Sequence, residues 1–118
     1  MTNAKKQRCY VGIDKEGTKR YYVNNVLHRE DGPAVEYANG DKWWYKNGEL
    51  HREEGPAIEH PNGNKFWYKN GMSHREDGPA AEFADNSKTW WLNNICYGTN
   101  NDFSSSSWIS FVKTLIFS

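Results

Sequence analysis

The sequence predicts a mainly β protein, a single elongated antiparallel meander of stacked β-hairpin repeats with one capping α-helix at its C-terminal end. Three observations predict it. The phrase HRE(D/E)GPA begins at His28, His51 and His74, which are 23 residues apart (51 − 28 and 74 − 51). An aromatic segment recurs between the phrases, and only residues beyond 103 show a helical pattern. A fixed period of this length is the signature of a stacked repeat array.

The strands of the middle repeats are expected from alternation and turn residues. Ala34–Ala38 alternates apolar and polar side chains, as a half-buried strand does. Asn39-Gly40 follows and indicates a hairpin, because a type I′ turn needs positive φ at both central residues. Lys42–Lys46 is then the return strand, and Asn47-Gly48 makes the second turn. Each repeat therefore contributes two short strands.

The outer copies of this unit are degenerate. We expect a first hairpin from Cys9–Ile13 and Lys19–Val23, and a last one from Ala80–Ala84 and Lys88–Leu92. In the last hairpin Asn86 stands where earlier copies have the turn glycine, and Asn tolerates a left-handed backbone better than most residues. Degenerate ends are typical of solenoids, whose terminal repeats have a neighbour on one side only.

A helix is predicted near the C-terminus. Trp108, Phe111, Val112, Leu115 and Ile116 follow the spacing of one apolar helix face. Ser104 is the expected N-cap, which places Phe103 and Trp108 at the two hydrophobic-staple positions. A helix this short must dock, and we expect it to cover the open end of the sheet after Trp90–Leu92. The alternative is that the helix forms the seam of a homodimer.

Length and charge restrict the class of protein. The 118 residues correspond to one domain, with a flexible N-terminus (residues 1–8), the array (9–98), and a linker with the amphipathic helix (99–118). Basic and acidic residues balance at 15 each, which gives no strong nucleic-acid signal. Cys9 and Cys96 lack metal or redox spacing. No apolar run has the length of a signal peptide core or a membrane span, so we expect a cytoplasmic location.

The repeated phrase is interpreted as a structural turn and loop. Histidine beside carboxylates suggests a metal or a general base, but equivalent residues of successive repeats lie about 9–10 Å apart, too far to share one zinc ion. We expect the arginines to pair with acids, since the planar guanidinium can hold a carboxylate through two bonds. No catalytic residues, metal or cofactor are expected. The structural residues are His28, Arg29, Gly32, Pro33, His51, Arg52, Gly55, Pro56, His74, Arg75, Gly78 and Pro79.

The aromatic segments form the candidate binding surface. Adjacent residues on a strand face opposite sides, so one aromatic row is expected in the core and the other partly exposed. The exposed row either packs across strands or forms a groove for a partner, because Trp and Tyr concentrate at binding hot spots. The candidate binding residues, with flanking lysines, are Trp44, Trp67, Trp90, Tyr45, Tyr68, Trp91, Lys42 and Lys65.

These motifs resemble a known family. The segment WYKNG followed by HRE(D/E)GPA, over residues 10–98, is similar to the MORN-type repeat, in the variant found in bacterial, phage, giant-virus and antitoxin-like proteins. The chain departs from the usual pattern where His-Arg-Glu-Asp-Gly-Pro replaces a simpler His-Gly-x-Gly. The resemblance implies a β-hairpin array used as a scaffold or recognition surface, without catalysis.

Three functions of different classes follow as hypotheses. The first is a non-enzymatic protein-binding module, such as a phage or mobile-element inhibitor that occludes a host defence protein (a CRISPR effector, for example) or an antitoxin that sequesters a toxin. This finer form rests on family analogy. The second is sequestration of a small ligand, such as a nucleotide signal, between tryptophans. The third is binding of acidic lipid through the lysine rows and the final helix.

Overall fold

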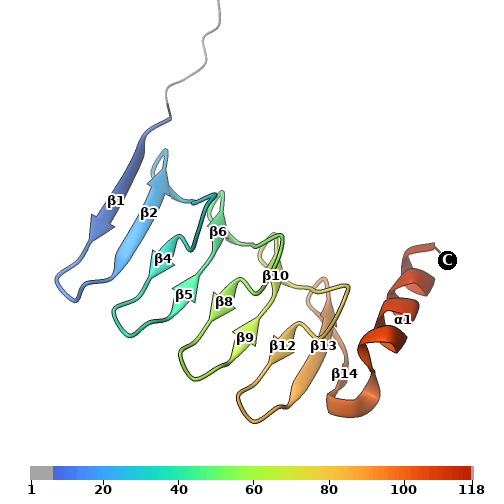
Figure 1. Ribbon diagram of the computed structural model, residues 1–118. Coiled ribbons are helices and arrows are strands. Elements are labelled where there is room, and N and C mark those ends of the chain that lie inside the picture. The colour runs from blue at the N-terminus through green and yellow to red at the C-terminus, as the bar shows by residue number, and fades with distance from the viewer. Residues whose placement is uncertain (1–6, 118) are drawn as a thin grey trace, which may run out of the picture.

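The chain folds as the predicted mainly β array with one C-terminal helix (Figure 1). The computed structural model describes residues 7–117, so the predicted flexible segment 1–8 lies outside it except for Gln7 and Arg8. Ten strands, all paired antiparallel, form one long sheet. In pairing order its main path is β1 (Cys9–Ile13), β2 (Lys19–Val23), β4 (Val35–Glu36), β5 (Lys42–Trp43), β8 (Ile58–Glu59), β9 (Lys65–Phe66), β12 (Ala81–Glu82), β13 (Lys88–Leu92) and β14 (Ile95–Thr99), and β3 (Val26–Leu27) pairs with β2.

The expected return strand Lys42–Lys46 is interrupted at Trp44. The Trp44 amide donates to the carbonyl of Ala57 at 2.7 Å, and its carbonyl accepts from the amide of His51 at 3.1 Å. The strand therefore leaves the long sheet and continues in a two-stranded ribbon. The ribbons are β6 (Tyr45–Lys46) with β7 (Glu49–Leu50), and β10 (Tyr68–Lys69) with β11 (Met72–Ser73).

The two Asn-Gly turns of a repeat differ from each other. Asn47 and Gly48 both have positive φ, 52° and 82°, as a type I′ turn requires. At Asn39-Gly40 only Gly40 does, at 98°, so the type I′ prediction is wrong there. The amide of Tyr37 donates to the carbonyl of Asp41 at 2.9 Å, which closes a three-residue loop with glycine in its left-handed position. Asn39 Oδ1 accepts the Asp41 amide and orders that loop.

The C-terminal helix α1 (Ser105–Phe117) packs on the last repeat as predicted, but the edge of β13 that it was expected to cover is paired with β14 instead. Ser104 Oγ accepts the amide of Ser107 at 3.1 Å, and the Phe103 and Trp108 rings lie 4.8 Å apart, so the N-cap and the staple are confirmed. Trp108 and Val112 pack on Trp90 and Leu92 of β13. Two elements between β13 and the helix in the chain were not predicted, β14 and the 3₁₀ turn η1 (Asn100–Asp102).

The apolar interior of the array is small and repeats with the sequence. Each phrase ends in a buried alanine, and the next residue is buried as well. These residues are Ala34, Val35, Ala57, Ile58, Ala80 and Ala81. The repeats are therefore held largely by hydrogen bonds and by aromatic contacts along the array.

Candidate functional site

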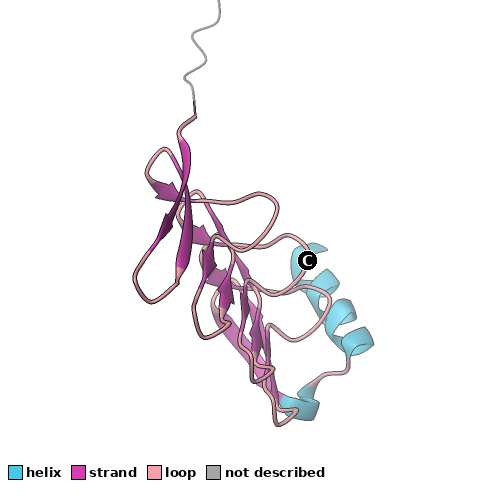
Figure 2. Ribbon diagram, turned by 60° about the vertical axis from the view of Figure 1, so that its left-hand side comes forward, coloured by secondary structure: helices cyan, strands magenta, loops and turns pink. Residues whose placement is uncertain are grey.

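The repeated phrases form loops that project from one side of the long sheet (Figure 2). We call this side the loop face and define it by residues 28–33, 51–56 and 74–79. Between the phrases, the strands beneath contribute one aromatic residue per repeat to this face. Among the described residues, the loop face holds most of the ion pairs.

Each phrase arginine lies flat on an aromatic ring. The guanidinium carbon of Arg52 is 3.9 Å from the ring centre of Trp44. Its Nη1 donates to the carbonyl of Pro56 at 3.1 Å and to Glu59 at 2.9 Å. The same arrangement joins Arg29 to Tyr21, Pro33 and Glu36, and Arg75 to Trp67, Pro79 and Glu82. Ring stacking and charge-assisted hydrogen bonds thus fix one orientation of each guanidinium.

The phrase glycine leaves room for this stack. A β-carbon on Gly78 would lie 2.7 Å from the guanidinium carbon of Arg75, and one on Gly55 would lie 2.9 Å from that of Arg52. Gly55 also has a φ of 134°, which side chains rarely allow. The guanidinium is therefore packed between an aromatic ring and a bare backbone.

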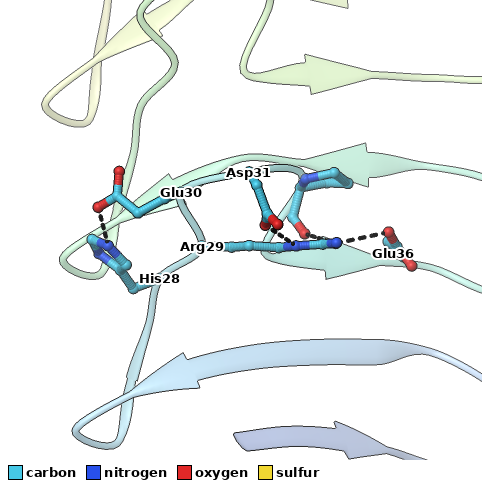
Figure 3. A network of polar contacts seen from close by, with 6 residues as sticks. His28, Arg29, Glu30, Asp31 and Glu36 are labelled. Atoms are coloured by element: carbon cyan, nitrogen blue, oxygen red, sulfur yellow. Dashed lines mark hydrogen bonds and ion pairs between the residues drawn. The ribbon is translucent and has the colours of Figure 1, made fainter. Parts of the chain in front are cut away.

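Each phrase histidine links one repeat to the next. His51 Nδ1 accepts the amide of Asn70, at the turn of the following ribbon, at 2.9 Å. The proton of the neutral ring therefore lies on Nε2, which is 2.6 Å from Glu53 Oε1. His28 and His74 repeat both contacts, and Figure 3 shows His28 on Glu30 beside the Arg29 network. The hydrogen bond to His51, with the nearby charge of Lys69, lowers the pKa of Glu53.

Two equivalent grooves lie between successive loops, one repeat apart. The first, of about 580 Å³, has Trp44 and Arg52 in its wall, and the second, of about 600 Å³, has Trp67 and Arg75. Carboxylates line both grooves, and most have side chains between 56% and 86% exposed. We call Glu30, Asp31, Glu53, Glu54, Glu76 and Asp77 the acidic rim. The tips of the loops thus present carboxylates, and the arginines lie beneath them.

The four predicted tryptophans differ in their surroundings: two line the grooves, one is in the core and one is half-buried on β13. Trp44 and Trp67 line the grooves, but one face of each ring is covered by arginine. Trp90, predicted to belong to the binding row, is 2% exposed and packs under Trp108, so it belongs to the core instead. Trp91 is half-buried and donates through Nε1 to Thr89 Oγ1 at 2.8 Å.

The second aromatic row, Tyr45 and Tyr68, lies in the two ribbons that leave the long sheet, and Tyr45 also lines the first groove. Tyr45 stacks on Trp43, whose ring also meets Tyr37 edge-on, and Trp43 is the register partner of the buried Val35. Burial raises the pKa of Tyr45. Tyr68 is the equivalent residue one repeat later. This row is therefore the one that packs with the buried strand residues.

The lysines do not form a basic row. Lys42 is the register partner of Glu36 and of Glu59, and Lys65 is the partner of Glu59 and of Glu82. Basic and acidic residues thus alternate from strand to strand, and opposite charges in such positions stabilise a sheet. The arrangement gives no support to lipid binding through lysine rows.

Sequence reasoning missed the strand glutamates that hold the arginines, Glu36, Glu59 and Glu82. The sequence contains a pattern that could have identified them, since they recur with the 23-residue period two residues after each phrase. It also missed Trp43 and Phe66, which lie on the packed side of the sheet. Trp108 was placed on the helix but not recognised as the ring that covers Trp90.

Within residues 7–117, no three His, Cys, Asp or Glu side chains come together as a metal would require. Each phrase histidine uses both ring nitrogens in hydrogen bonds. None of the described helices combines the length and apolarity that crossing a bilayer requires.

Comparison with known proteins adds no relative: no family model, curated protein or solved structure matches this chain. The similarity to MORN-type repeats therefore stays a prediction from the repeated residues.

Proposed function

We propose that the chain is a non-enzymatic protein-binding repeat module that contacts its partner with the loop face. The observation that carries this proposal is the pair of equivalent grooves, each with a tryptophan-arginine stack in its wall and carboxylates on its rim. Trp and Arg are enriched at binding hot spots. Because hydrogen bonds already order the stacks, little conformational freedom is lost on binding.

The acidic rim favours a partner with basic side chains at its surface. A nucleic-acid channel of a host defence protein, such as a CRISPR effector, is such a surface. The more specific proposal is that this chain inhibits such a protein by blocking that channel. Sequestration of a toxin with a basic surface is the alternative. In both cases the partner's basic groups would meet rim carboxylates at the spacing of the repeats, about 9–10 Å.

Capture from a bacterial lysate with two matched variants tests the proposal. Asp31→Asn with Glu54→Gln removes two charges from the rim of the first groove and keeps the side-chain shapes. Glu16→Gln with Glu49→Gln removes two exposed charges that line neither groove. We expect one stoichiometric partner that the rim variant loses and the control keeps, with binding that weakens as salt is raised.

Two results would contradict the proposal. The first is equal capture by all three proteins, which would place recognition outside the loop face. The second is the absence of any stoichiometric partner in lysates of every host tried.

A further inference from the structure

The first strand, β1, is an edge of the long sheet (Figure 1). Hydrogen-bonded and non-hydrogen-bonded residue pairs alternate along an antiparallel ladder. The carbonyl of Arg8 accepts from Asn24, and the amide of Asp14 donates to Thr18, so the even-numbered residues of β1 face β2. The amides and carbonyls that point away from the sheet are those of Cys9, Val11 and Ile13.

This edge lacks the usual protection. Natural edge strands carry charges, proline or bulges that prevent pairing with another chain, but Cys9–Ile13 has none of these. Its apolar side chains are open: Tyr10 is 46%, Val11 47% and Ile13 64% exposed. Of the residues that the structure describes, none covers the outer side of β1 in the pairing order.

The opposite edge, β14, is protected. Its ladder with β13 contains a register shift between Trp90 and Trp91. The carboxylate of Asp102 accepts the amide of Thr99 at 2.8 Å, which occupies a donor at the end of the strand. The two ends of the sheet are therefore not equivalent, and only β1 is a regular open edge.

We propose that β1 pairs antiparallel with β1 of a second copy of this chain, with Val11 opposite Val11 on a two-fold axis. In this register the outward residues form hydrogen-bonded pairs with each other, Cys9 with Ile13 and Val11 with itself. The three side chains on that face then make one apolar stripe across both copies. The long sheet continues from one copy into the other. Because a two-fold contact uses the β1 edge of both copies, the assembly stops at the dimer.

The side chains of the other face are also self-complementary in this register. Tyr10 lies opposite Gly12 of the second copy, and glycine leaves room there while the Tyr10 ring keeps its stack on Tyr22 of β2, with ring centres 4.9 Å apart. Arg8 lies opposite Asp14 of the second copy. The hydrogen bond from Arg20 lowers the pKa of the Asp14 carboxyl, which keeps that group ionised. Opposite charges therefore meet at both ends of the paired strands.

The dimer is expected to be weak. A pairing of two short strands buries less than a standard interface, which places it in the transient class. Its consequence is a doubled array, with two sets of loop-face grooves joined rigidly. A partner with two matching surfaces would then gain from avidity.

Sedimentation velocity over a range of concentrations tests the dimer. We expect the full chain to pass from monomer to dimer, and Val11→Lys to remain monomeric, because two lysines would meet on the axis. Ile95→Lys is the matched control, since Ile95 is 55% exposed on β14 at the other edge. It should dimerise like the wild type. A wild type that is monomeric at every concentration overturns the proposal. So does loss of dimer in Ile95→Lys alone, or growth beyond the dimer.

Single cysteines test the register. In a Cys9→Ser, Cys96→Ser background, Val11→Cys should oxidise to a covalent dimer, because directly opposed residues of a hydrogen-bonded pair lie about 5.5 Å apart, within disulfide range. Ile13→Cys should not, since the two copies of residue 13 would be about 13 Å apart. Equal cross-linking at both positions, or more at residue 13, overturns the proposed pairing.

Discussion

Several neighbouring groups contact the arginine of each phrase. These contacts explain which residue types surround it in the sequence. In the third phrase, Asp77 accepts from Nε of Arg75 at 2.8 Å and Pro79 supplies a carbonyl. Gly78 leaves the space that the guanidinium fills above Trp67. The second phrase has Glu54 at the position of Asp77, and Arg52 keeps its stack and its Nη1 bonds without it. Ring, glycine, proline carbonyl and strand glutamate are therefore common to all three phrases.

Replacement of Gly78 tests this packing. Gly78→Ala would place a methyl group 2.7 Å from the guanidinium carbon of Arg75 and push it off the Trp67 ring. We expect a loss of about 1–3 kcal/mol in the free energy of unfolding, the sum of a cation–π contact and hydrogen bonds to a charged group. Urea unfolding followed by circular dichroism measures it.

The double variant supplies the control. In an Arg75→Ala background the methyl group meets no guanidinium, so Gly78→Ala should change the unfolding free energy far less than in the wild type. Residues that share a contact deviate from additivity in this way. Additive losses would show that the glycine is needed for another reason.

At the scale of elements, α1 completes the last repeat. Arg29, Arg52 and Arg75 each cover the aromatic residue of their own repeat, but Trp90 has no arginine one period further on, where Gly98 stands. Trp108 covers it instead, with ring centres 5.4 Å apart. The indole Nε1 of Trp108 donates to the carbonyl of Arg75 at 2.9 Å and so joins the helix to the last phrase.

Removal of this ring should uncap the array. Trp108→Ala deletes a fully buried side chain from the cluster with Trp90 and Phe103, and such deletions cost about 3–5 kcal/mol. We expect a large fall in the urea midpoint, measured by far-ultraviolet circular dichroism. Ile109→Ala, on the exposed side of the same helix, should stay within about 0.5 kcal/mol of the wild type. Similar losses for both variants would contradict a capping role.

Local sequence patterns predicted the positions of strands, turns and helix better than they predicted which strands pair with each other. The hairpins, the Asn47-Gly48 turn and the Ser104 cap depend on neighbouring residues, and they were visible in the sequence. The interruption at Trp44 was not visible, because it arises from bonds to Ala57 and His51. Alternation showed that two aromatic rows exist, but their exposure depends on which row the arginines cover. Only the three-dimensional stack settles that.

For the whole molecule, stability should depend on contacts between neighbouring repeats. The amide of Gly48 donates to Leu27, and that of Gly71 donates to Leu50, so successive ribbon turns are bonded in the same way. The histidine links and the arginine amides repeat with them, since Arg29 and Arg52 donate to Tyr45 and Tyr68. Each interface is nearly a copy of the next, and in such arrays the free energy of folding is approximately a sum of repeats and interfaces.

Deletion of one complete repeat should therefore preserve the fold. Removing residues 51–73 joins Leu50 to His74, so Ala80 takes the place of Ala57 as acceptor for Trp44, and Asn93 remains the donor to the histidine. We expect cooperative unfolding with a lower midpoint and a smaller denaturant slope, because less surface is exposed on unfolding. A shorter deletion of residues 51–69 breaks the period and should leave an unfolded chain. If both deletions unfold the protein, its repeats do not act as interchangeable units.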